Sequence, residues 1–157
     1  MNKRISSSSQ DYLEAILELS RENEGVRVTD IANKLNIRKA SVTQAINVLS
    51  DDGLVIKERY GPVFLTSKGI EEAERVKIKH SLLKHFFEKV LGVNVAIAEN
   101  DACLIEHSLS EETFLFFAEF LNKEGYLKDF SKKSKLEEII SEDYNEKYGD
   151  LSLCLKK

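Results

Sequence analysis

Long hydrophobic segments are missing from this 157-residue sequence, which has no run of about 18 or more apolar residues. Its first seven residues also lack the apolar stretch that a secretory signal peptide needs. We therefore expect a cytoplasmic protein with no membrane partner. Cysteine is scarce as well, and Cys103 and Cys154 lie far apart in the chain. Thiols or metal thiolates explain these two residues better than a disulfide framework does.

An overall excess of positive charge is also missing, because the net charge is −4. This balance argues against a protein that coats nucleic acid indiscriminately, which needs clustered lysine and arginine. The charge is unevenly divided, with a net +1 in residues 1–69 and −5 in residues 70–157. Between Arg27 and Gln44 the only acidic residue is Asp30. Such a local basic patch is what a sequence-selective DNA-binding protein needs.

Catalytic signatures are missing too. Cys103 and His107 could act as a nucleophile and its base, or in a metallohydrolase, but no glycine-rich phosphate loop or nucleophile elbow accompanies them. We therefore predict that the chain is not an enzyme and takes no small organic substrate. A hydrophobic content of 42% is sufficient for the core of one compact domain or of two small ones.

Apolar residues at helical spacing predict three helices in the N-terminal part of the chain. The first helix is expected to follow the serines at 6–9, which can cap it, and to end near Gly25. The second helix contains Ile31, Ala32 and Leu35 and ends around Asn36. The third runs through residues 40–49 and is expected to end at Gly53.

Two β-rich segments, residues 54–60 and 63–66, flank the Gly61-Pro62 turn and predict a β-hairpin. Three helices followed by a hairpin form a winged helix-turn-helix, in which the third helix enters the major groove and the hairpin, or wing, contacts the DNA backbone. Amide, guanidinium and small side chains on that helix can read base edges, and basic side chains can bind phosphates. The predicted DNA contacts are Arg27, Arg38, Lys39, Ala40, Ser41, Thr43, Gln44, Asn47, Lys57 and Arg59. The alternative is that they are ordinary solvated residues, since helix-turn-helix folds also serve as protein-binding modules.

The second half of the chain reads as helical throughout. A long amphipathic stretch runs from about Ile70 to Gly92, and further helical stretches cover residues 96–107 and 110–123. The last of these is rich in phenylalanine, which suggests a helical dimer interface. We therefore predict a mostly α fold with a small β wing. A winged helix-turn-helix DNA-binding domain occupies residues 1–69, and a helical metal-binding and dimerisation domain occupies residues 70–157.

A set of possible metal ligands centres on Cys103, Glu106 and His107. Their spacing of i, i+3 and i+4 places a thiol, a carboxylate and an imidazole on one face of a helix. All three are ligands of first-row metals. The other candidates are Glu99, His80 on the preceding helix, and Asp11 with Glu14 on the first helix. Without further support, Cys103 could equally be a small buried hydrophobic residue, and His80 or Glu106 a surface or ion-pair residue.

From about Ser9 to Ser110 the chain resembles the diphtheria toxin repressor family, which includes iron-dependent regulators and manganese transport repressors. The shared segments stand in the same order and cover roughly two-thirds of the chain. They are Asp11-Tyr12-Leu13-Glu14, Ala40-Ser41-Val42-Thr43-Gln44, Gly53-Leu54-Val55, Leu65-Thr66-Ser67-Lys68-Gly69, Lys79-His80, Asn100-Asp101-Ala102-Cys103 and Ile105-Glu106-His107. The resemblance implies a homodimer that binds a palindromic double-stranded operator when loaded with metal and represses genes for metal uptake.

The ligand set that the resemblance implies is a hybrid. Cys103, Glu106 and His107 agree with the iron type, whereas Asp11 and Glu14 agree with the manganese type. His80 suits both types. The iron type would also have a carboxylate at position 84 and an imidazole at position 99 in an ancillary site, where this chain has Lys84 and Glu99. A lysine pointing inward at that place would repel a metal ion.

The expected cofactor is Mn²⁺ or Fe²⁺, with Co²⁺ or Zn²⁺ possible in vitro. Carboxylates at Asp11 and Glu14 favour Mn²⁺, whereas the Cys103 thiolate favours softer ions; we lean weakly to manganese. The hypothesis is that metal ties the first helix to the second domain and so favours the DNA-binding spacing of the two recognition helices. The rival is a metal-independent winged-helix regulator that senses a small molecule or a partner protein.

Overall fold

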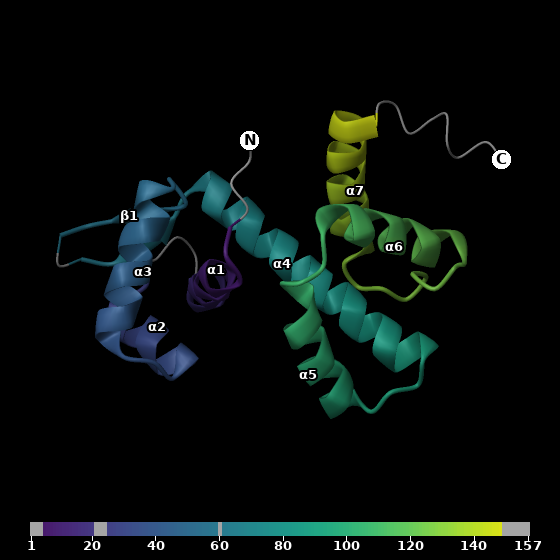
Figure 1. Cartoon of the computed structure of the whole chain (residues 1–157), viewed down its shortest axis with the longest axis horizontal. Coiled ribbons are helices and arrows are strands. Elements are labelled where there is room, and N and C mark those ends of the chain that lie inside the picture. The colour runs from purple at the N-terminus through teal and green to yellow at the C-terminus, as the bar shows by residue number, and fades with distance from the viewer. Residues whose placement is uncertain (1–4, 21–24, 60, 149–157) are drawn as a thin grey trace. The chain divides into compact units, whose positions relative to one another are not determined.

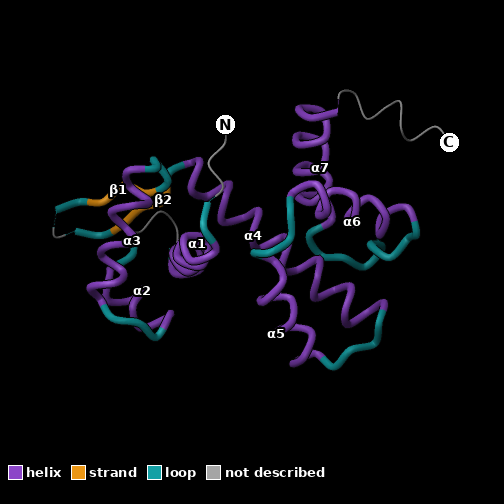
Figure 2. Tube along the Cα trace, in the orientation of Figure 1, coloured by secondary structure: helices purple, strands orange, loops and turns teal. Residues whose placement is uncertain are grey.

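The computed structural model describes residues 5–20, 25–59 and 61–148, and Figures 1 and 2 show the elements they form. The helices are α1 (Ser7–Leu19), α2 (Val28–Leu35), α3 (Lys39–Asp51), α4 (Ser67–His85), a π-helical turn η1 (Phe86–Val90), α5 (Val95–Glu106), α6 (Glu111–Lys123) and α7 (Lys133–Tyr148), and the strands are β1 (Val55–Lys57) and β2 (Val63–Leu65). The predicted mostly helical fold with a small β wing is confirmed. No described helix is both long and apolar enough to cross a membrane.

Two compact units make up the chain, Met1–Lys77 and Ile78–Lys157, and the boundary between them falls within α4. Cys154 lies outside the described residues.

Helix α1 begins where the serine run predicts but ends earlier than expected. The Ser6 hydroxyl oxygen accepts a hydrogen bond from the Ser9 amide at 3.1 Å and caps the helix. At the other end Ser20 has an extended backbone, and its hydroxyl donates to the Ile16 carbonyl at 2.7 Å. Ser20 therefore satisfies a carbonyl of the last turn, and the prediction of a helix reaching Gly25 is wrong.

The turn between α2 and α3 depends on Asn36. This residue has φ = 54°, the left-handed conformation that asparagine tolerates better than most residues. Its amide bonds back to the last turn of α2, so the chain leaves that helix at once and α3 starts at Lys39. The short connection expected of a helix-turn-helix is confirmed.

The wing is an antiparallel pair in which Val55 lies opposite Leu65 and Lys57 opposite Val63. Val26 joins it through two backbone hydrogen bonds with Val63, each 2.8 Å long. The chain before α2 is thus attached to the outer side of β2, which links the helix-turn-helix to the wing.

The wing connects to α4 through Thr66 and Gly69. The Thr66 hydroxyl donates to the Gly53 carbonyl at 2.8 Å and accepts from the Gly69 amide at 3.0 Å, so it caps α4. A Cβ atom at Gly69 would lie 2.0 Å from the carbonyl oxygen of Leu54. Only glycine allows α4 to begin this close to the strand.

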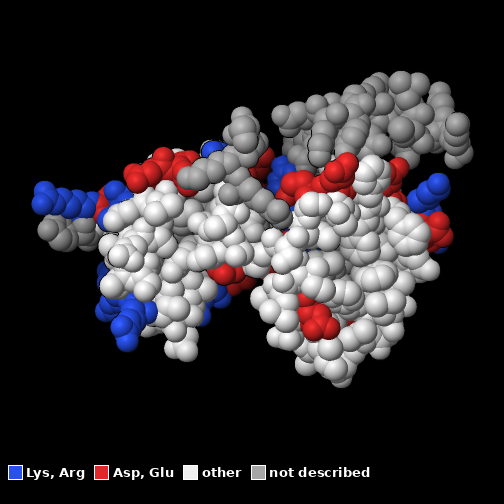
Figure 3. All heavy atoms as spheres, viewed as in Figure 1, with Lys and Arg blue, Asp and Glu red and all other residues white. Residues whose placement is uncertain are grey.

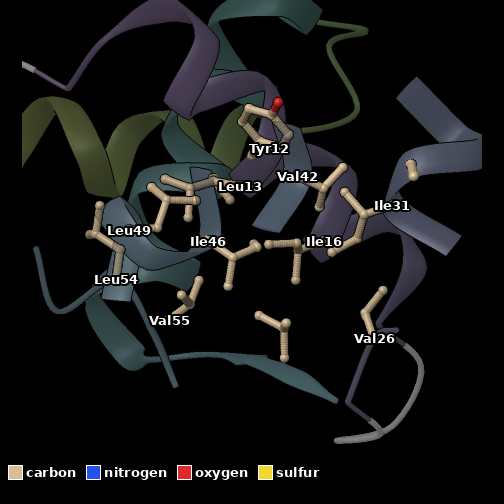
Figure 4. Close-up of a cluster of buried hydrophobic side chains, with 13 residues drawn as sticks. Tyr12, Leu13, Ile16, Val26, Ile31, Val42, Ile46, Leu49, Leu54 and Val55 are labelled. Atoms are coloured by element: carbon tan, nitrogen blue, oxygen red, sulfur yellow. The ribbon is translucent and has the colours of Figure 1, made fainter. Parts of the chain in front are cut away.

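The first unit has an almost purely apolar core, shown in Figure 4. Leu13 and Ile16 from α1 pack against Val42 and Ile46 from α3, and all four are fully buried. These spacings of three and four residues are the buried faces that helical periodicity predicts. Burial of one such side chain contributes about 1.5–3 kcal/mol.

The second unit has its own core of α4, α6 and α7 side chains. Phe114 and Leu121 are fully buried in it beside Leu82 and Leu136, whereas Phe116 and Phe120 are about half exposed. This unit therefore buries only part of the aromatic surface of α6. Two of these phenylalanines stay on the surface.

The long helical stretch expected up to Gly92 is α-helical only as far as His85. After His85 the backbone forms the π-helical turn, and Gly92 with φ = 71° ends the segment. His85 is half-buried: its Nε2 lies 2.8 Å from the Tyr126 carbonyl oxygen and its ring packs edge-on against Phe130.

Candidate DNA-binding surface and metal centre

The outer face of α3 carries the predicted recognition residues. Arg38, Lys39, Ala40, Ser41, Gln44 and Asn47 are exposed. On the same helix Val42, Ile46 and Leu49 are fully buried. The helix therefore presents its polar face to solvent while its apolar face anchors it. Thr43 is half-buried and its hydroxyl donates to the Lys39 carbonyl at 3.0 Å, so it is already engaged within the helix.

One wing residue contacts the recognition helix directly. The Lys57 ammonium donates to the Asn47 side-chain oxygen at 2.7 Å. Both residues were predicted as independent DNA contacts, Lys57 to phosphate and Asn47 to a base. The structure brings them together. Because the side-chain oxygen of Asn47 accepts from Lys57, its amide nitrogen is the group that can still donate to another partner.

Basic side chains gather on the first unit around the hairpin and the start of α3, as Figure 3 shows. Arg27 and Arg59 are exposed, as their predicted phosphate contacts require. Lys34 departs from the expected patch because its ammonium pairs with Glu18 of α1 at 2.5 Å. The basic surface is therefore narrower than the sequence between Arg27 and Gln44 suggests.

In the second unit a buried carboxylate joins α5 to α4. Glu106 is only 3% exposed, and its Oε2 lies 2.7 Å from Nδ1 of His80. This hydrogen bond raises the pKa of His80, although burial of the ring acts in the opposite direction. Glu106 is thus neither a surface residue nor an isolated buried charge.

His107 lies on the other side of the same carboxylate. Its Nε2 is 3.2 Å from Glu106 Oε1, so two imidazoles flank one buried carboxylate. Cys103 lies one turn earlier on α5, and its side chain is exposed. The alternative that Cys103 is a buried hydrophobic residue is therefore wrong.

A second carboxylate, Glu99, lies on the far side of the His80 ring. Its Oε1 is 3.0 Å from His80 Nε2, and its Oε2 is 2.5 Å from the Lys84 ammonium. The hydrogen bond from Lys84 lowers the pKa of Glu99, and the same bond raises the pKa of Lys84. Lys84 also lies 3.8 Å from Glu88.

These side chains contact one another in pairs, and they do not form a preorganised metal-binding site. Among the described residues, no three histidine, cysteine, aspartate or glutamate side chains surround one point where a metal ion would fit as they stand. The donor types nevertheless fit a divalent transition metal, because imidazole, carboxylate and thiol are its usual ligands. Glu106 with His80 and His107 is the part of the set that the structure brings into direct contact.

The remaining predicted ligands, Asp11 and Glu14, stand one turn apart on α1 in the first unit. Asp11 is exposed and Glu14 is half-buried. Their role as ligands stays a prediction.

Sequence reasoning missed the contacts of two lysines in the second unit, Lys79 and Lys84. Lys79 is 4% exposed, pairs with Glu111 and lies 5.5 Å from the centre of the Phe114 ring. The sequence signal that could have indicated the burial of Lys79 is its position next to His80, on a helix in which charged and apolar residues alternate. Lys84 was identified only as a cation where the iron type has a carboxylate, and its ion pair with Glu99 could not be predicted from sequence spacing.

Comparisons with known proteins cover both units. Residues 4–63 match the family described as iron dependent repressor, N-terminal DNA binding domain, and residues 66–125 match iron dependent repressor, metal binding and dimerisation domain. An uncharacterised HTH-type transcriptional regulator of Methanocaldococcus jannaschii is 38% identical over 120 residues, which are 76% of this chain and 96% of that protein.

Solved structures of regulators have the same fold. A manganese-dependent transcriptional repressor in complex with manganese superposes with a TM-score of 0.63 at 25% identity, over 73% of this chain and 52% of the other. For T. acidophilum IdeR the TM-score is 0.60 at 29% identity, over 72% and 53%. The chain thus spans about half the length of these solved proteins.

Proposed function

This chain belongs to the iron-dependent repressor family of metal-dependent, DNA-binding transcriptional regulators, and we propose that it binds a palindromic operator as a homodimer when loaded with Mn²⁺ or Fe²⁺. Its targets in this proposal are genes of metal uptake, and it works in the cytoplasm. Members of the family are regulators and not enzymes, so the prediction of a non-enzymatic protein is confirmed.

The observation that carries the proposal is the buried Glu106 carboxylate between two imidazoles, 2.7 Å from His80 and 3.2 Å from His107. A carboxylate removed from water needs a cationic partner or several hydrogen bonds. A bound divalent ion supplies positive charge there and Lewis acidity toward these donors. His80, Glu106 and His107 hold the ion in this proposal, with Cys103 as a fourth donor one turn away.

The choice of metal follows from the donors. Carboxylate and imidazole ligands bind both Mn²⁺ and Fe²⁺, and a thiolate at Cys103 adds preference for Fe²⁺, Co²⁺ or Zn²⁺. The predicted carboxylates Asp11 and Glu14 favour Mn²⁺, and manganese is the ion that we favour in this proposal. Cys103 is exposed, so it must be kept reduced in any comparison of metals.

DNA recognition in this proposal belongs to the exposed face of α3. Gln44 and Asn47 read base edges, Arg38 and Lys39 contribute charge at the start of the helix, and the wing contacts phosphates. The support is that these side chains are exposed while the opposite face of the helix is fixed in the core.

The homodimer is supported by apolar side chains that the second unit leaves in solvent. On α5, Val95, Ile97 and Leu104 are 60%, 55% and 68% exposed. Apolar residues gathered on one helix at this exposure are typical of a protein interface. A second copy of the chain is the occupant we propose, in keeping with the dimerisation domain that the family match describes.

The deciding experiment titrates MnCl₂ and FeCl₂ anaerobically into full-length protein with a palindromic operator obtained by in vitro selection. For the wild type we expect metal to increase operator affinity by about 5–150-fold, the usual range of coupling between sites. Glu106→Ala and His107→Ala should remain folded dimers that lose this gain.

The matched control is Glu124→Ala, which removes an exposed carboxylate of the same unit. It should respond to metal like the wild type. Circular dichroism and sedimentation without metal establish that each variant is folded and dimeric. A full metal response in Glu106→Ala and in His107→Ala would contradict the assigned metal centre.

A further inference from the structure

The Lys84 side chain reaches into a group of acceptors next to the candidate metal centre. Its ammonium lies 2.5 Å from Glu99 Oε2 and 3.8 Å from Glu88 Oε1. The Glu88 oxygen is buried and forms no hydrogen bond with any described residue. Glu99 in turn contacts His80 through its other oxygen. One lysine therefore contacts two carboxylates, and one of these, Glu99, also contacts the His80 ring.

The two ring nitrogens of His80 contact two different carboxylates. Nδ1 faces Glu106, in the proposed metal centre, and Nε2 faces Glu99. When Nε2–H donates to Glu99, Nδ1 is the nitrogen left with a lone pair for a metal ion. A metal-binding histidine is commonly oriented in this way by a carboxylate that accepts its other N–H.

We propose that the Lys84 ammonium holds Glu99 in place as the outer hydrogen-bond partner of His80 and excludes a second divalent ion from the Glu88 and Glu99 carboxylates. This inference rests on the proposed function. It assigns Glu99 a positioning role in place of the ligand role that the sequence suggested.

The exclusion follows from distance and charge. A metal ion bound to Glu99 would lie within a few ångströms of the ammonium, and like charges at that separation repel each other strongly where water is partly excluded. The ammonium is tethered to α4, so it cannot diffuse away as a bound ion can. Without it, the Glu88 and Glu99 carboxylates would face the vacated place, and carboxylate oxygens suit Mn²⁺.

An ordinary surface ion pair is the competing explanation. Lys84 is one-third exposed and Glu99 half exposed, and such pairs contribute little to stability. Thermal stability alone therefore cannot separate the two explanations. The number of bound ions can, because a surface pair does not affect it.

The first experiment counts Mn²⁺ per chain by equilibrium dialysis and atomic emission on reduced, full-length protein without DNA. Lys84→Gln should bind one ion more than the wild type. Lys89→Gln removes a positive charge from an exposed position on η1 and should keep the wild-type count. The double variant K84Q/E99Q should also keep it. An unchanged count in Lys84→Gln overturns the proposal.

The second experiment separates a positioning residue from a ligand. Glu99→Ala should keep the wild-type number of ions and bind them about 10–100-fold more weakly, the usual cost of losing an outer partner. Glu99→Gln, which retains a hydrogen-bond acceptor, should restore part of that affinity. Loss of one ion in Glu99→Ala would make Glu99 a ligand and overturn the proposal.

The two proposals fail in different ways. If the wild type binds no Mn²⁺ or Fe²⁺, or if His107→Ala binds them unchanged, the proposed metal centre fails. If the wild type binds metal through His107 and Lys84→Gln gains no ion, only the inference about Lys84 fails.

Discussion

The two units bury different kinds of side chain. The first unit encloses apolar residues such as Leu13 and Ile46, and its candidate recognition residues lie outside on α3. Among the described residues, the buried charged ones are Lys79 and Glu106, and both belong to the second unit. A surface that reads DNA needs only a rigid support, whereas a switch needs polar groups inside, where a change of charge has a large effect.

The largest expected effect tests whether the two cores are separate. Leu13→Ala should destabilise the first unit by about 2–5 kcal/mol, because the side chain is fully buried. Hydrogen exchange measured by mass spectrometry should show lost protection in α1–α3 and unchanged protection in α6. Val48→Ala, on the exposed side of α3, is the control and should have little effect. An equal loss in α6 would mean that the cores unfold together.

The next effect concerns the buried lysine of the second unit. Lys79→Ala should cost about 2–4 kcal/mol, since it empties the space that the side-chain stem fills beside Phe114. Lys79→Met keeps that volume and should cost less than about 1.5 kcal/mol, because Glu111 is half exposed and can turn to water. Chemical denaturation measures both. Equal losses would show that the charge, and not the packing, stabilises this contact.

A surface substitution in the first unit should change recognition and not stability. Gln44→Ala should reduce discrimination at one base pair of each half-site by about 1–3 kcal/mol. The melting temperature should stay that of the wild type, because Gln44 is exposed. Asn33→Ala removes an exposed amide from α2 and serves as the control. Competition binding with operators substituted at single positions would show unchanged discrimination if Gln44 reads no base.

The smallest effect lies at the junction between the wing and α4. Thr66→Val removes the hydroxyl that caps α4 and bonds to Gly53, at a cost of about 1 kcal/mol. Ser67→Ala, at the exposed neighbouring position, should be close to neutral. Thermal denaturation compares the two. Equal stability of both variants would show that polar contacts matter little in the first unit.

The winged helix was predictable because its signals are local. Apolar spacing, Gly53 and the Gly61-Pro62 turn act within a few residues, and each predicted element is present. The end of α1 was missed because it depends on the Ser20 hydroxyl bonding back to Ile16, a choice that periodicity does not reveal. The π-helical turn after His85 was missed for a similar reason, since the apolar pattern continues through it.

The candidate metal centre was predictable only in part. Helical spacing brings Glu106 and His107 together because both lie on α5. The contacts of His80 with Glu106 and of Lys84 with Glu99 join α4 to α5, so they depend on how two helices pack, which sequence spacing does not specify. The sequence suggested His80 and Glu99 as separate ligands, whereas the structure pairs Glu99 with both His80 and Lys84.

The contact between Lys57 and Asn47 has a consequence for the entropy of DNA binding. Long exposed side chains lose about 0.5–1.5 kcal/mol each when an interface immobilises them. Here the wing lysine and the recognition-helix amide already restrain each other at 2.7 Å. Part of that ordering is therefore complete before DNA arrives. If Asn47 reads a base as proposed, shortening Lys57 would make the complex harder to form even where Lys57 itself contacts no DNA.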